Sequence, residues 1–137
     1  MIFLQYILGG STTILNHFSS ALTQYATHGH VIREHLKTIR SREENLDESK
    51  RRRRNVFKKA DEAEKKLSKM NPEHKNLQTQ ADLLSRLRDE IRSMDTNLIV
   101  EEAALGDFKR TATKMWMGLK FCGLMECCEK GSVGVFF

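Results

Sequence analysis

The fold is decided by residues 77–122, which read LQTQADLLSRLRDEIRSMDTNLIVEEAALGDFKRTATKMWMGLKFC. Steps of three and four residues through this stretch visit an almost wholly apolar series: Leu77, Gln80, Leu84, Leu87, Ile91, Met94, Leu98, Glu101, Leu105, Phe108, Ala112, Met115, Leu119 and Cys122. Such spacing keeps one narrow apolar seam on one side of an α-helix, and a seam of more than six heptads needs a partner helix. The stretch therefore predicts a long helix that lies along another helix.

The composition of the whole chain agrees with long helices. Its 137 residues, enough for one domain, are 30% charged and 39% hydrophobic and include a single proline. The formal net charge of +5 indicates an anionic partner, either nucleic acid or an acidic membrane surface. Residues 30–70 carry 14 Lys+Arg against 8 Asp+Glu, whereas residues 71–137 carry 9 against 10. The positive excess therefore lies in the first half of the chain.

A second, patchier seam runs through residues 22–69. Its members are Leu22, Tyr25, Gly29, Ile32, Leu36, Ile39, Glu43, Leu46, Lys50, Arg53, Phe57, Ala60, Glu64 and Leu67. Charged residues interrupt it in the middle and near its end, so we expect a continuous helix over residues 22–69 that packs more firmly at its ends than at its centre.

Asn71 and Pro72 separate the two predicted helices. Asn71 suits an N-cap and Pro72 the first helical position, which places a turn at residues 70–71 and the second helix at residues 72–122. A short connection between long helices favours an antiparallel pair. The predicted fold class is therefore all-α: a long antiparallel helical hairpin or coiled coil.

The two ends of the chain differ from this pattern. Residues 1–21 are apolar and carry no Asp, Glu, Lys or Arg. We expect them to form a poorly ordered leader; the alternative is a short helix that touches a membrane, although such helices usually carry Lys or Arg on a polar face. Residues 22–131 are expected to form the helical domain and residues 132–137 a short tail.

A row of cations follows one side of the first predicted helix. On a wheel of 100° per residue, six cations fall within about 40° of one line beside the apolar seam, namely Arg33, Lys37, Arg40, Arg51, Lys58 and Lys69, and two more, Arg54 and Lys65, fall within about 60°. We expect six of these cations to bind lipid and call them the basic stripe: Arg33, Lys37, Arg40, Arg51, Arg54 and Lys58. A charge run is often only a solvated helix face. The four consecutive arginines of residues 51–54 favour binding, because clustered cations repel one another unless an anionic surface neutralises them.

Two anionic surfaces fit the basic stripe. A basic helix that runs into a leucine zipper could enter DNA, but here Asn71-Pro72 separates the cations from the better heptads. A membrane surface requires only a row of cations, each contributing about 1 kcal/mol near an anionic leaflet. We therefore expect an anionic lipid partner and no nucleic acid. The alternative is a coiled-coil interaction module that binds acidic protein or RNA.

No pattern in the sequence predicts catalysis, a cofactor or a metal. Phosphate-binding loops, nucleophile elbows and HExxH motifs do not occur. His28, His30 and His35 are expected to be exposed. Cys122, Cys127 and Cys128 lack the spacing of a zinc site, and we expect them to be free thiols in a reducing compartment. We therefore expect that the protein is not an enzyme.

Three segments resemble the fungal eisosome core components of the Pil/Lsp type: YATHGHVIREHLKTIRSREENLDESKRRRRNV, KKLSKMNPEHKNLQTQADLLSRLRDEIRSMD and EEAALGDFKRTATKMWMGLKFCGLMECCEKG. The resemblance covers roughly residues 25–131. The chain resembles a partial or truncated member of the family, because residues 1–20 resemble nothing in the family and the family's first long helix has no counterpart in this sequence.

The resemblance implies a BAR-type helical domain that dimerises and assembles as a scaffold under the plasma membrane. In that family a basic face binds phosphoinositide-containing membrane, and the matching motif REHLKTIR carries this role onto Arg33, Lys37 and Arg40. The expected partners are anionic lipid and other copies or relatives of the chain. The expected location is the cytoplasmic face of the plasma membrane, at the cell cortex.

Overall fold

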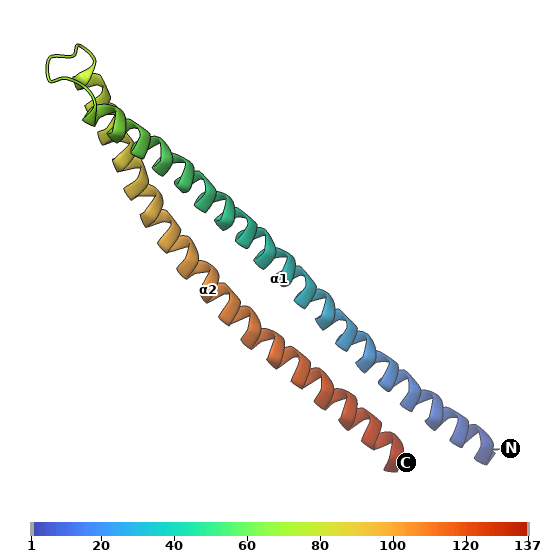
Figure 1. Ribbon diagram of the computed structural model, residues 1–137. Coiled ribbons are helices and arrows are strands. Elements are labelled where there is room, and N and C mark those ends of the chain that lie inside the picture. The colour runs from blue at the N-terminus through green and yellow to red at the C-terminus, as the bar shows by residue number, and fades with distance from the viewer. Residues whose placement is uncertain (1, 137) are drawn as a thin grey trace. The chain divides into compact units, whose positions relative to one another are not determined.

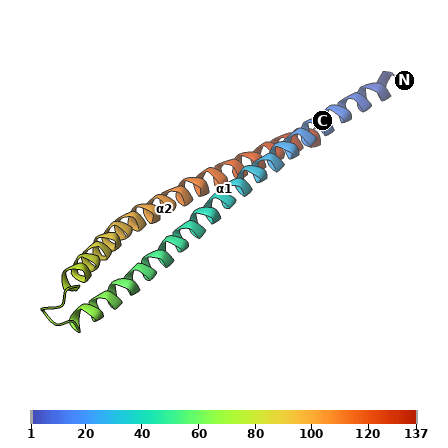
Figure 2. The ribbon, with the colours of Figure 1, turned by 90° about the horizontal axis from the view of Figure 1, so that it is seen from above.

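The protein is an all-α helical hairpin. The computed structural model describes residues 2–136, and of residues 127 and 130–136 it describes the backbone alone. Helix α1 spans Ile2–Ser68, helix α2 spans Leu77–Phe136, and the two helices pack against each other (Figure 1, Figure 2). The prediction of an all-α hairpin is confirmed.

Both helices are longer at their outer ends than the sequence predicted. Residues 2–21, predicted to be a leader, form the first turns of α1, and residues 132–136, predicted to be a tail, belong to α2. The predicted helix bounds of 22–69 and 72–122 were therefore wrong. Extending an existing helix costs far less than starting one, so the helical regions beside these stretches carry them along despite the glycines.

The connection is also longer than predicted, because Asn71 and Pro72 form a turn and do not begin α2. The His74 N–H donates to the Asn71 carbonyl at 3.0 Å, which closes a four-residue turn with Pro72 in its second position. Asn in the first position and Pro in the second are favoured in type I turns. The same two residues also suit a helix start, which explains the error.

Helix α2 is capped by Asn76. Its carbonyl accepts the first helical hydrogen bond, from the Gln80 N–H at 3.0 Å, and its own N–H donates to Nδ1 of His74 at 3.2 Å. Asparagine is a favoured N-cap residue. The cap therefore lies five residues after the asparagine that the sequence indicated.

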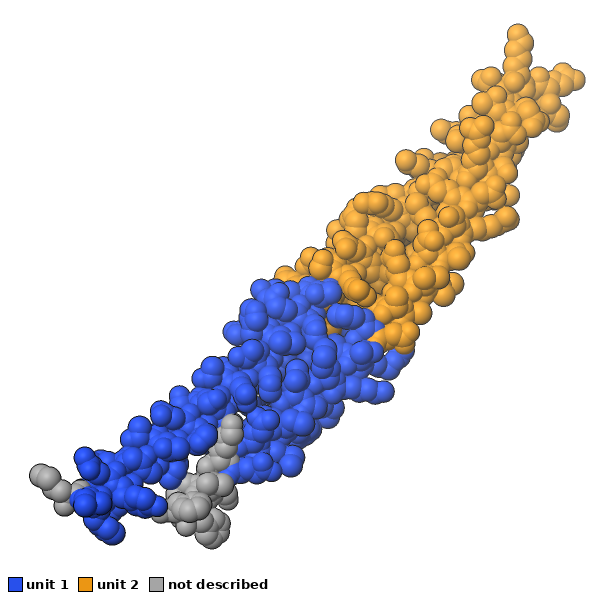
Figure 3. Space-filling view, turned by 180° about the vertical axis from the view of Figure 1, so that it is seen from behind, with its two compact units in different colours: residues 1–38, 108–137 blue, residues 39–107 orange. Residues whose placement is uncertain are grey.

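The contacts divide the chain into two compact units (Figure 3). Unit 1 comprises residues 1–38 and 108–137, and unit 2 comprises residues 39–107. The predicted domain of residues 22–131 thus takes in all of unit 2 and part of unit 1. In each unit a segment of α1 lies against a segment of α2.

The core of unit 2 pairs small residues of α1 with branched residues of α2. Buried Ala60, Ala63 and Leu84 form its centre, and Leu67, Leu87 and Ile91 pack around them. The alanines leave room for the larger side chains opposite, so the two backbones can approach closely.

Half of the predicted seam of α1 is shifted by one residue. Every seventh residue from Tyr25 to Leu67 is buried or half-buried as predicted, and we call these positions the seven-residue series. The other series was wrong at Leu22, Leu36 and Phe57, which are 48, 49 and 54% exposed, whereas its members Gly29 and Lys50 are half-buried. The residues that precede this second series face α2 in its place: Ala21, His28, His35, Ser49, Val56 and Ala63.

In unit 1 the helices meet through aromatic and polar side chains. Trp116 donates its indole N–H to Nδ1 of His35 at 2.9 Å, and the two rings are stacked. Gly123 is buried, and a Cβ added there would lie 3.1 Å from the ring of Tyr25 and 3.2 Å from Nδ1 of His28. The expectation of exposed histidines was therefore wrong for His28 and His35, which are half-buried.

Candidate lipid-binding surface

All six residues of the basic stripe are exposed on α1. Each stands one or five residues after a contact position of the seven-residue series: Arg33, Lys37, Arg40, Arg51, Arg54 and Lys58. At 100° per residue these positions lie about 100° and 140° from the contact residue, so they are directed away from α2 within their own unit. The two sets of positions are neighbours on the helix wheel.

Unit 1 contributes Arg33 and Lys37. The Lys37 ammonium pairs with the Glu34 carboxylate at 2.8 Å, and both side chains are at least half exposed. This hydrogen bond, together with the charge of Lys37, lowers the pKa of Glu34 below its ordinary value. Arg33 makes no ion pair within the described residues and adds to the positive field around Glu34.

Unit 2 contributes the other four residues of the basic stripe. Arg40 donates to the Glu44 carboxylate at 3.0 Å, in a pair whose side chains are 82 and 66% exposed. Arg54 makes only a long contact of 3.4 Å, to a backbone carbonyl of its own helix. In the part of the chain that the structure describes, Arg51 and Lys58 form no ion pair. These cations are therefore open to an external anion.

The four consecutive arginines do not act as one group. Arg53 points to α2, where its guanidinium forms a two-pronged pair with the Asp95 carboxylate, one prong measuring 3.2 Å. Arg52 pairs with Glu48 on its own helix at 3.4 Å. Only Arg51 and Arg54 remain on the basic stripe. The run of residues 51–54 is thus partly a helix–helix contact.

The sequence did not predict the ion pairs between the helices. Lys50 reaches Glu102 at 2.7 Å, and Arg88 reaches Glu64 at 3.0 Å. The hydrogen bond to Glu102 raises the pKa of Lys50. The available signal was the failure of the apolar series at residues 50, 53 and 64, each of which has an oppositely charged partner on α2.

The hydrogen bond between Arg53 and Asp95 changes the pKa of both groups. It raises the pKa of the guanidinium and lowers that of the carboxyl group below its ordinary value. Both side chains are more than a third exposed, the arginine at 34% and the aspartate at 42%. The pair therefore specifies which residues face each other more than it adds to stability.

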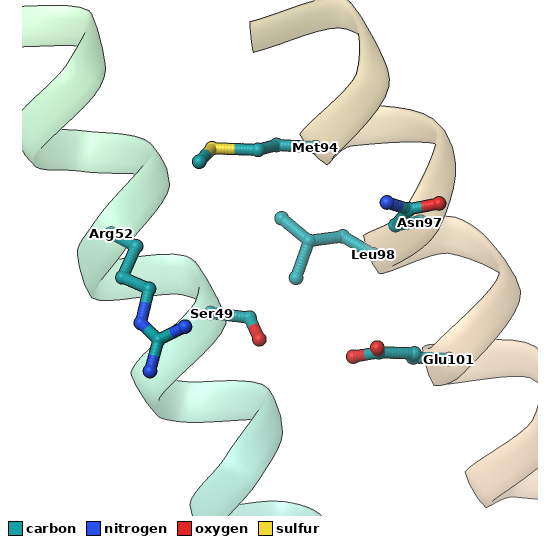
Figure 4. A pocket seen from close by; sticks show the side chains of 6 residues that line it. All are labelled: Ser49, Arg52, Met94, Asn97, Leu98 and Glu101. Atoms are coloured by element: carbon teal, nitrogen blue, oxygen red, sulfur yellow. The ribbon is translucent and has the colours of Figure 1, made fainter. Parts of the chain in front are cut away.

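An open groove lies between the helices in unit 2 (Figure 4). Its volume is about 180 Å³, and Met94 and Leu98 extend from α2 toward α1. A second open groove of about 280 Å³ shares Ser49 and Glu101 with it. The first groove is lined by polar side chains, among them those of Arg52, Asn97 and Glu101, and by the apolar side chains of Met94 and Leu98. Such a lining suits surface contacts of mixed polarity.

Metal-ligating and thiol groups are dispersed. Within the described residues no three His, Cys, Asp or Glu side chains are placed to hold a metal ion. Cys122 and Cys128 are exposed free thiols, and the side chain of Cys127 lies outside the described residues. Trp116 and Phe108 are half-buried, and the centroid of each ring lies 6.1 Å from that of His35.

Neither helix, over its described residues, contains an apolar stretch long enough to cross a bilayer. Comparison of the chain with protein-family models, curated proteins and solved structures gives no match.

Proposed function

We propose that this protein is a non-enzymatic membrane scaffold that binds anionic lipid, including phosphoinositides, through the basic stripe of α1 and assembles by helix packing. The observation that supports it best is the separation of the cations into two groups. Lys50 and Arg53 face α2 and are neutralised there by acids. The cations of the basic stripe are exposed on the other side of the same helix.

The local acids do not prevent lipid binding. The pairs of Lys37 with Glu34 and of Arg40 with Glu44 are exposed pairs within one helix, and such pairs contribute little to stability. A cation near an anionic leaflet contributes about 1 kcal/mol. Exchange of the carboxylate for a lipid phosphate is therefore favourable, and the resemblance to eisosome proteins leads to the same surface.

Assembly with further helices is supported by uncovered apolar side chains. On α2, Leu83, Ile99 and Val100 are 44, 67 and 61% exposed, and on α1 Phe57 is 54% exposed. Further helices could cover these exposed apolar side chains, so the proposed partners are copies or relatives of this chain at the cytoplasmic face of the plasma membrane.

Sedimentation with vesicles tests the proposal. The change Arg51→Ala/Arg54→Ala/Lys58→Ala should reduce binding to phosphoinositide-containing vesicles by about a hundredfold, because three contacts of about 1 kcal/mol are lost. A parallel loss is expected for Arg33→Ala/Lys37→Ala/Arg40→Ala. Uncharged vesicles should bind little of either variant or of the unmodified chain.

The matched control is Arg52→Ala/Lys59→Ala/Lys66→Ala, which removes the same charge from exposed residues of α1 that lie outside the basic stripe. It should lose binding only severalfold. An equal loss in both variants would mean that net charge and not the basic stripe governs binding. Tight retention of RNA at physiological salt, without vesicle binding, would replace the membrane proposal by the nucleic-acid alternative.

A further inference from the structure

The first part of α1 is free of charged side chains. Residues 2–32 contain no Asp, Glu, Lys or Arg, and Arg33 is the first charged residue after them. The structure places all of them in one helix, α1. An uncharged helical stretch of this length is unlike the rest of the chain, where charged residues are frequent.

Within this stretch, residues 2–8 are apolar except for Gln5. The consecutive side chains of Ile2, Phe3 and Leu4 are 86, 77 and 63% exposed. The next turn adds Tyr6, Ile7 and Leu8, at 83, 52 and 63%. Steps of 100° spread these six side chains over about two thirds of the helix circumference and place the exposed Gln5 on the remaining side, so one partner helix could cover only part of the apolar side chains.

Helix α2 does not cover this segment. In Figure 2 the blue start of α1 extends past the red end of α2, which belongs to the same unit. Gly9 and Gly10 follow, with nothing within 4 Å of an added Cβ at either position. Two glycines cost a helix about 1 kcal/mol each, so the helix can change direction here at low cost.

The two threonine hydroxyls that follow the glycines are satisfied within the helix. The Thr12 hydroxyl donates to the carbonyl of Leu8 at 2.8 Å, and the Thr13 hydroxyl donates to the carbonyl of Gly9 at 3.0 Å. Hydroxyls bonded in this way lose less on leaving water than free hydroxyls do. Residues 2–8 can therefore enter an apolar phase with one polar side chain, that of Gln5, and no charged side chain.

We propose that residues 2–8 insert among the acyl chains of one leaflet and anchor unit 1 to the membrane that the basic stripe contacts. An apolar phase covers all six apolar side chains at once, which a second copy of one helix cannot do, and Gln5 lies on the remaining side of the helix. Seven residues of helix measure about 10 Å, less than half of a hydrocarbon core of about 30 Å, so the segment enters the bilayer without crossing it. The inference rests on the proposed membrane function and adds an apolar anchor to its electrostatic contacts.

Quenching by brominated lipid measures the insertion. Phe3→Trp and Phe57→Trp place a reporter on two exposed phenylalanines of α1, the second as a matched control in unit 2. The signal of Trp116, recorded on the unmodified chain, is subtracted. With vesicles of phosphatidylcholine and phosphoinositide brominated at mid-chain, the reporter at position 3 should be quenched severalfold more than the one at position 57.

Substitution gives an independent readout. The change Phe3→Ser/Ile7→Ser should weaken vesicle binding by about tenfold or more and remove the quenching of a reporter at position 6, introduced as Tyr6→Trp. The control Ile99→Ser/Val100→Ser removes comparably exposed apolar side chains from α2 and should leave that quenching unchanged. Far-ultraviolet circular dichroism should show equal helicity in both variants.

The outcomes separate this inference from the proposed function. Vesicle binding that depends on the basic stripe, with equal quenching at positions 3 and 57, would overturn the insertion and leave the function standing. Self-association in the absence of lipid that is lost in Phe3→Ser/Ile7→Ser, without quenching at position 3, would assign the segment to a second copy and overturn the insertion. Absence of any vesicle binding would overturn both.

Discussion

The contact register of α1 gives the sharpest prediction, because the two possible registers give opposite results for two substitutions. Ala63 is 5% exposed and sits in the core of unit 2, whereas Phe57 is 54% exposed. In the register read from the sequence, Phe57 would be the buried residue. The substitutions are Ala63→Leu and Phe57→Ala.

The magnitudes follow from burial. Leucine at position 63 would add three heavy atoms between closely spaced helices, and such overpacking costs about 1–3 kcal/mol of unfolding free energy. Phe57→Ala removes a half-exposed ring that lies 6.0 Å from the Arg53 guanidinium, and it should cost about 1 kcal/mol or less. A fully buried phenylalanine would cost about 3–5 kcal/mol.

Urea unfolding followed by circular dichroism at 222 nm measures both changes. The control is Ala103→Leu at an exposed position of α2, where the two residues differ little in helix propensity, so stability should stay within about 0.5 kcal/mol. A loss of more than about 3 kcal/mol in Phe57→Ala, with a gain in Ala63→Leu, would refute the register described here.

Three further predictions concern single sites. Asp95→Asn should remove part of the acid dependence of stability, because the pKa of Asp95 is lowered by its hydrogen bond to Arg53. The stability from this pair is present above the ordinary carboxyl pKa of about 4 and is lost as pH falls through the lowered value, so urea midpoints of the variant and the unmodified chain should converge from pH 6 to pH 2. Gly118→Ala should stabilise by up to about 1 kcal/mol, since nothing lies within 4 Å of an added Cβ, whereas Gly123→Ala, where the Cβ would meet a ring and an imidazole at 3.1 and 3.2 Å, should not raise the melting temperature. Trp116→Phe deletes the hydrogen bond to an imidazole of α1 and should cost about 1 kcal/mol of unfolding free energy, measured by urea titration.

The sequence predicted the hairpin because its strongest signal is periodic. The seam of α2 holds from Leu77 to Ala112 except at Glu101, which is exposed. A long apolar repeat depends only on side-chain spacing, and no competing turn interrupts it. The fold class was therefore accessible without coordinates.

The register of α1 was not accessible in the same way. Large apolar residues such as Leu36 and Phe57 favour one reading, but helices that approach closely select small residues such as Ala60 and Ala63. That choice depends on the volume of the side chains opposite, which a single helix pattern does not contain. The position of α2's cap was missed for a related reason, since Asn71-Pro72 suits both a helix start and a turn.

The basic stripe was predicted as a set of neighbours on one helix face, and the structure places all six residues there and exposed. What they bind stays a prediction. The sequence could not reveal that Arg53 leaves the cluster for Asp95, because a charge run does not state which member faces another helix. Only the partner carboxylate on α2 distinguishes Arg53 from its neighbours.

Three ion pairs between the helices of unit 2 have a consequence for misfolding. Sliding α2 by one heptad in one direction would bring Lys50 opposite Lys109 and Glu64 opposite Asp95, and only Arg53 would keep an acid opposite it, Glu102. Sliding it the other way would bring Arg53 opposite Arg88, and only Lys50 would keep an acid opposite it, Asp95. Each slipped alignment would therefore replace three attractive pairs by one attractive pair and at least one like-charge pair, so electrostatics favours the native alignment over slips that a repeating apolar pattern would otherwise tolerate.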